Sequence, residues 1–182
     1  MKKKAAVILL LICVVGAGAV AAGRMIPAAT FSDAADGGNA SEKLVYVHYA
    51  GTYLSLDQNE TVCANNSECP SGIPEITGVE FINLAFGEKA DPEESSALDY
   101  VIKVALCLNK HGIRADQIHY DSRMVDVMIG KLKICLGKND KTEDKISDLS
   151  NFIDKLEGAD GTLYMQNGNA NNYGYTFRAN KS

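Results

Sequence analysis

Residues 91–158, which open with Asp91-Pro92-Glu93-Glu94 and close with Gly158, decide the fold that this sequence predicts. Asp91 can cap the free backbone amides, and Pro92 has the fixed φ that suits the first position of a helix. Apolar residues follow at helical spacing until Gly112, a residue type typical of helix C-termini: Leu98, Val101, Ile102, Ala105 and Leu106. The pattern predicts a helix over residues 91–112.

Two more helices are predicted within the same stretch. One begins at residue 116 or 121 and rests on the spacing of Ile118, Val125, Met128, Ile129 and Leu132. The other covers residues 140–158. Asp140 and Glu143 have the spacing of a capping box, and one apolar stripe runs along the helix to the closing glycine: Ile146, Leu149, Ile153 and Leu156.

Strands are predicted on both sides of this helical block. Residues 44–49 and 79–86 are β-branched and aromatic, and residues 53–56 either extend the first strand or begin its partner. Asn167-Gly168 lies between two further apolar-polar segments and is typical of a hairpin turn. We therefore expect a single small α+β domain over residues 44–182, with two or three strands, three helices and one or two disulfides.

The first 22 residues are predicted to be a secretory signal. Lys2, Lys3 and Lys4 precede an uncharged run over residues 5–22 that ends in small residues. The alternative is an uncleaved membrane anchor, because this run approaches the length needed to span a bilayer. Residues 23–43 are poor in large apolar side chains and are predicted to be a flexible spacer.

Charge excludes one class of function. The whole chain has a net charge of −5, and removal of residues 1–22 takes away three lysines, which leaves −8. Affinity for nucleic acid depends on Lys and Arg, so an acidic surface of this size argues against nucleic-acid binding.

Four cysteines remain after residue 22: Cys63, Cys69, Cys107 and Cys135. An even number in an exported chain predicts two disulfides. Cys63 and Cys69 flank a short polar loop that a local bridge could close. Cys107 and Cys135 would be about 20 Å apart if the second helix were continuous. Either the pairing crosses over between the two groups, or that helix stops near Gly130 and residues 131–136 form a strand.

Common catalytic signatures are absent from the sequence, which has no Gly-rich phosphate loop, no GxSxG and no HExxH. His48 and His111 are best explained by structural roles in a strand and at a helix C-terminus, and His119 near Asp121 is too weak a signal for a dyad. No cysteine or histidine spacing is typical of a metal site. We predict no catalytic residue, no metal and no cofactor.

One order of segments resembles a known family. Phe81-Ile-Asn-Leu-Ala-Phe-Gly87, Lys131-Leu-Lys-Ile-Cys-Leu-Gly137, an amphipathic helix and Ala159-Asp-Gly161 follow residues 44–49, and this order resembles the first half of a family 18 glycoside hydrolase (chitinase-like) barrel. The resemblance implies a barrel fold and sugar binding. The family's catalytic acidic run is replaced by Thr-Leu-Tyr-Met-Gln-Asn, so it implies a carbohydrate binder or a remnant enzyme.

The leading functional hypothesis is an exported, small, non-enzymatic binding protein that acts on a protein partner or a cell-surface component such as a glycan. Tyr173 and Tyr175, in an aromatic and polar tail, are the predicted contact residues. The alternatives are a chitinase-like carbohydrate binder and a membrane-anchored envelope subunit that keeps residues 5–22. The expected location is outside the cytoplasm, either secreted or in the periplasm and cell envelope.

Overall fold

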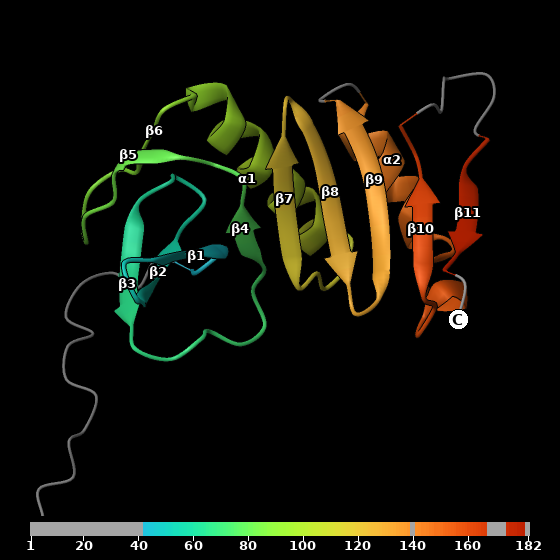
Figure 1. Cartoon of the computed structure of the whole chain (residues 1–182), viewed down its shortest axis with the longest axis horizontal. Coiled ribbons are helices and arrows are strands. Elements are labelled where there is room, and N and C mark those ends of the chain that lie inside the picture. The colour runs from blue at the N-terminus through green and yellow to red at the C-terminus, as the bar shows by residue number, and fades with distance from the viewer. Residues whose placement is uncertain (1–41, 139–140, 167–173, 181–182) are drawn as a thin grey trace, which may run out of the picture. The chain divides into compact units, whose positions relative to one another are not determined.

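Strands dominate the computed structural model, which describes residues 42–138, 141–166 and 174–180. Nine strands form one mixed sheet in the order β11-β10-β9-β8-β7-β4-β1-β2-β3, and β5 and β6 form a separate two-stranded sheet (Figure 1). All the described residues belong to one structural unit, Gly37–Ser182.

The first part of the chain builds one end of the large sheet. Its strands are β1 (Val45–Tyr49), β2 (Thr52–Leu56), β3 (Val62–Asn66) and β4 (Glu75–Thr77). β1, β2 and β3 pair antiparallel in sequence order, whereas β4 lies parallel to β1. Ala50 and Gly51, between β1 and β2, have φ values of 49° and 85°. Two positive φ values define the primed turn that matches the twist of a hairpin.

The centre of the sheet is an antiparallel meander of β7 (Gln117–Asp121), β8 (Met124–Ile129) and β9 (Leu132–Lys138). The predicted second helix over these residues is therefore wrong. Ile118 and Tyr120, and then Val125 and Val127, are buried in alternation with more exposed neighbours, which is the period of a strand. Val125, Met128 and Ile129 also fall at helical spacing, which is why the pattern fits both structures. The alternative that made residues 131–136 a strand is confirmed.

Two helices connect parallel neighbours in the sheet. α1 (Ser95–Lys110) lies in the chain between the parallel strands β4 and β7, and α2 (Thr142–Ser150) with the 3₁₀ helix η1 (Ile153–Leu156) lies between β9 and β10 (Gly161–Tyr164). β11 (Thr176–Ala179) then pairs antiparallel with β10. The predicted Asn167-Gly168 turn between these two strands lies outside the described residues.

The core forms where the helices cover the sheet. Figure 1 shows α1 and α2 on the same face of β7–β10. Side chains from this face and from the helices are almost completely buried: Leu98, Val101, Val104, Leu108, Ile118, Val125, Val127, Ile134, Ile146 and Leu149. The opposite face carries half-exposed residues such as Gln117, His119, Asp126 and Lys133. We call it the uncovered face.

The expected α+β domain with three helices and two or three strands is corrected by this architecture. The described residues form eleven strands, two α-helices and one 3₁₀ helix. The predicted strand over residues 79–86 is reduced to β5 (Phe81–Asn83), which pairs with β6 (Asp91–Pro92). The predicted helix start at Asp91 is also displaced, since Asp91 and Pro92 lie in β6 and α1 begins after Glu94.

The expected chitinase-like barrel is also wrong. Such a barrel places its successive strands side by side in parallel. Here β1 pairs antiparallel with β2, the strand that follows it, residues 81–83 leave the large sheet, and β7, β8 and β9 form an antiparallel meander.

The expected disulfides are corrected as well, because Cys63, Cys69, Cys107 and Cys135 are free thiols. The Cys63 thiol contacts the carbonyl oxygen of Ser55 at 3.4 Å, and the Cys69 thiol contacts the hydroxyl of Tyr46 at 3.2 Å. Cys107 belongs to α1 on the covered side of the sheet, whereas Cys135 lies beside Asp126 on the uncovered face. The sheet therefore separates Cys107 from Cys135, which excludes one of the pairings that the sequence leaves open.

Candidate interaction surface

The predicted contact residues have different positions in the structure. Tyr173 lies outside the described residues. Tyr175 is half-buried just before β11, where its ring packs against Phe152 with 6.1 Å between the ring centroids. Its hydroxyl donates a hydrogen bond to Asp148 Oδ2 at 2.7 Å. Tyr175 therefore attaches the start of β11 to the α2 region.

Two of the three histidines, His48 and His119, contact neighbouring side chains in the sheet. His48 stacks on Tyr53 with 4.8 Å between the ring centroids and an interplanar angle of 21°. His119 on β7 has its Nδ1 at 2.9 Å from Thr77 Oγ1 on β4. His111 lies at the C-cap of α1, as the sequence predicts.

The uncovered face brings a thiol, a carboxylate and an imidazole onto three adjacent strands. Asp126 on β8 lies opposite His119 on β7 and opposite Cys135 on β9. Lys133 Nζ is 2.7 Å from Asp126 Oδ2. Burial and the nearby Asp126 carboxylate raise the pKa of Cys135 to about 11. At neutral pH this thiol is therefore protonated.

This arrangement does not make a cysteine nucleophile. His119 and Cys135 are two strand spacings apart, about 9–10 Å, because β8 lies between them. An activated cysteine needs a neighbouring base and a lowered pKa. Burial raises the pKa of Cys63 and of Cys107 as well. His119, Asp126 and Cys135 therefore form part of a polar surface and do not form a catalytic group.

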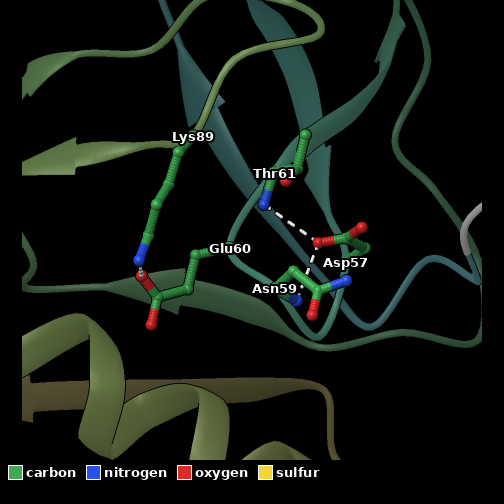
Figure 2. Close-up of polar contacts among 5 residues, drawn as sticks. All are labelled: Asp57, Asn59, Glu60, Thr61 and Lys89. Atoms are coloured by element: carbon green, nitrogen blue, oxygen red, sulfur yellow. Dashed lines mark hydrogen bonds and ion pairs between the residues drawn. The ribbon is translucent and has the colours of Figure 1, made fainter.

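A polar turn joins β2 to β3, and Figure 2 shows the contacts that hold it. The buried Asp57 carboxylate accepts hydrogen bonds from the backbone N–H groups of Asn59 at 2.8 Å and Thr61 at 2.9 Å. Glu60 has a φ of 64° and pairs with Lys89, with 3.2 Å between Oε2 and Nζ. Burial, with a further contribution from a hydrogen bond to Asp99, raises the pKa of Glu60.

Next to this turn, the chain itself occupies the outer side of β3. The Val62 N–H donates to the carbonyl oxygen of Glu88 at 2.9 Å, and the Gly87 N–H donates to the carbonyl oxygen of Val62 at 2.8 Å. An edge that bonds to its own chain is protected from another strand. The β3 end of the sheet is therefore partly closed.

The β11 edge differs from the β3 edge. All four β11 residues are exposed, and the hydrogen bonds between described residues place no strand on its outer side. The Asn180 N–H donates inward to the carbonyl oxygen of Asp160 at 3.0 Å. Backbone groups alternate along a strand, so the N–H groups of Phe177 and Ala179 point outward.

Side-chain contacts hold β11 against β10. The Arg178 guanidinium lies 5.4 Å from the centroid of the Tyr164 ring. Opposite Ala179, a side chain at Gly161 would place its Cβ 2.4 Å from the carbonyl oxygen of Arg178. Gly161 thus allows β11 to lie close to β10. Sequence analysis missed this edge, although the polar second arm after Asn167-Gly168 was its signal.

Other kinds of site find no support within residues 42–138, 141–166 and 174–180. No three His, Cys, Asp or Glu side chains there form a group that could hold a metal ion. No helix in the described part of the chain is long and apolar enough to cross a membrane. The predicted signal over residues 1–22 lies outside the described residues.

Comparison with known proteins gives one structural likeness. No family model matches the sequence, and no curated protein matches it. Among solved structures, the chain is similar to the major extracytoplasmic domain of the trans isomer of the bacterial cell division protein DivIB from Geobacillus stearothermophilus. The sequences are 17% identical, the match covers 66% of this chain and 98% of that chain, and the TM-score is 0.42. The resemblance to the first half of a family 18 glycoside hydrolase barrel is therefore contradicted, because the strands do not pair as in that barrel and the structural likeness is to another protein.

Proposed function

We propose that this chain is an exported, non-enzymatic protein-binding domain that accepts a strand of another protein along β11. The open β11 edge carries the proposal. A strand edge presents unpaired N–H and C=O groups, and an extended peptide can add to it through main-chain hydrogen bonds.

The contrast between the two ends of the sheet supports this function. β3 is bonded to the carbonyl oxygen of Glu88, whereas β11 is exposed over its whole length and contains no proline. Natural edges that are not used for binding are commonly blocked by proline, lysine or a bulge. β11 has Arg178 as its single basic residue, and that guanidinium lies over Tyr164.

Export is part of the proposal and rests on residues 1–22. Their basic start, uncharged centre and small-residue end are typical of a secretory signal. The hypothesis of an uncleaved anchor leaves the β11 edge unchanged, because both forms contain the same sheet.

The test is photo-crosslinking of the full chain in the cells that make it. The chain carries a photo-reactive benzoylphenylalanine at position 177, and covalent adducts are detected after irradiation. The same experiment is repeated with Ala179→Pro, which removes an outward-facing N–H. We expect a discrete adduct with a second protein, which Ala179→Pro abolishes because proline removes the donor to the added strand.

Two controls separate binding from folding. Ala179→Ser keeps the N–H and is expected to keep the adduct. Arg178→Pro removes an inward N–H and is expected to lower Tm, whereas Ala179→Pro leaves Tm nearly unchanged. An adduct that forms equally well with Ala179→Pro, or an adduct only with a second copy of this chain, would contradict the proposal.

A further inference from the structure

A second surface lies away from β11, on the segment that contains β5. Ile82 is 66% exposed and Phe86 is 67% exposed, the two largest values among the exposed large hydrophobic residues of the described chain. We call these two residues the apolar patch. Leu84, between them, is 8% exposed and anchors the segment in the core.

Backbone pairing holds the segment that carries the apolar patch, with a register shift between Phe81 and Asn83. β5 pairs with β6 through Phe81 opposite Pro92 and Asn83 opposite Asp91. The chain following Phe86 bonds to β3, since the Gly87 N–H donates to the carbonyl oxygen of Val62. The exposed side chains therefore project from an ordered base, as a preformed binding surface requires.

Most charged side chains in the segment that carries the apolar patch are carboxylates. The exposed acidic residues of residues 79–94 outnumber the single lysine there: Glu80, Glu88, Asp91, Glu93 and Glu94. The Glu93 N–H donates to the carbonyl oxygen of Glu80, which places these two residues opposite each other. Asn83 Nδ2 donates to Glu88 Oε2 at 3.3 Å. Lys89 already pairs with Glu60.

We infer that this surface binds a basic segment of a second protein, with apolar side chains on Ile82 and Phe86 and Lys or Arg side chains on the carboxylates of the same segment. Charge complementarity selects this occupant, because a group of charges of one sign raises the local concentration of partners of the opposite sign. The same carboxylates oppose an anionic membrane surface. The inference is independent of β11, because β5–β6 and β10–β11 lie at opposite ends in Figure 1.

The experiment uses the full chain and a short fluorescein-labelled peptide of Lys, Leu and Phe, followed by fluorescence anisotropy. We expect the peptide to bind, binding to weaken with added NaCl, and an analogue with Glu in place of Lys not to bind. The double variant Ile82→Ser, Phe86→Ser should weaken binding by about tenfold or more, because it removes the apolar area that the peptide buries on the patch.

Met124→Ser is the matched control, since Met124 is also exposed, at 41%, but lies on β8. It should leave peptide binding unchanged, and neither variant should lower Tm, because none of these side chains is buried. A further variant, Glu80→Gln with Glu93→Gln, removes two negative charges and leaves the apolar patch intact. It should also weaken peptide binding.

Several results would overturn the inference. Equal binding by the double serine variant would mean that net acidity alone attracts the peptide. Equal binding of the Glu analogue would remove the charge argument. Sedimentation with phosphatidylcholine or phosphatidylglycerol vesicles that depends on Ile82 and Phe86 would assign the apolar patch to a membrane, and a dimer lost in the same variant would assign it to a second copy.

Discussion

The Cys135 thiol lies between charges of opposite sign on the uncovered face. The Asp126 carboxylate raises the pKa of Cys135, and the Lys133 ammonium lowers it, while burial makes the largest contribution upward. Lys133 and Asp126 also bind each other at 2.7 Å. Each charge can be removed by a separate substitution. The two substitutions should shift the pKa of Cys135 in opposite directions.

Asp126→Asn should make Cys135 react severalfold faster with iodoacetamide at pH 9. The substitution removes the negative charge that disfavours the thiolate, and the thiolate is the reactive form. Alkylation of the Cys135 peptide is followed by mass spectrometry. Lys133→Gln should slow the same reaction, and equal rates in both variants would contradict this electrostatic account.

The ionisation of Glu60 makes the stability of the fold depend on pH. Its pKa is raised in the folded state, chiefly by burial, so the fold favours the neutral acid. Its contribution to stability is therefore complete below the ordinary pKa of 4.5 and is lost as the pH rises through the raised value.

Glu60→Gln should accordingly reduce the loss of stability as the pH rises above the ordinary pKa of 4.5, because glutamine cannot ionise. The loss of the Lys89 pair costs little, since the lysine side chain is 69% exposed. Tm measured across this pH range tests the effect, with Glu68→Gln in an exposed loop as the control. Parallel curves of Tm against pH for Glu60→Gln and the unchanged chain would count against it.

At the scale of elements, α1 separates buried from exposed leucines within one turn. Leu108 is 2% exposed and packs in the core, whereas Leu106 is 39% exposed. The sequence placed Leu106 on the apolar stripe of this helix, together with four residues that are indeed buried. Its exposure follows from its position at the rim of that stripe, which periodicity does not resolve.

Leu108→Ala should lower the free energy of unfolding by about 2–5 kcal/mol, because it removes buried methyl groups and leaves a cavity. Leu106→Ala, the matched change on the same helix, should cost about 0.5 kcal/mol or less. Urea unfolding measures both variants. Similar losses for the two variants would contradict the orientation of α1, in which Leu108 faces the core and Leu106 faces solvent.

Sequence patterns predicted some elements well for a physical reason. The strands over residues 44–49 and 53–56 and the helices near α1 and α2 follow from local propensity and local turn residues. The stretch from 116 to 136 was assigned to a helix because Val125, Met128, Ile129 and Leu132 fit a period of 3.6 as well as they fit strands. Ser122 and Arg123 make the β7–β8 turn with positive φ values, and neither is the Gly, Asn or Asp that typically marks such a turn in a sequence.

At the scale of the whole molecule, the candidate surfaces depend on topology. Among the described residues, β11 is the last strand of the sheet, and no local pattern indicates which strand of nine will be last. The apolar patch is exposed because residues 81–83 leave the large sheet, although their composition predicts a buried strand. The disulfide prediction failed for the same reason, since the sheet separates Cys107 from Cys135.

The meander also has a consequence for the order of assembly. β7, β8 and β9 meet their neighbours across two-residue connections, whereas β10 reaches β9 only after α2 and η1 have folded across the sheet. Short connections lose little chain entropy on closing, so we expect the meander, like the β1–β2 hairpin, to form before β10 and β11 join the sheet. β11 then joins a framework that is already complete. A partner that recognises this last strand would thereby distinguish mature molecules from half-assembled ones.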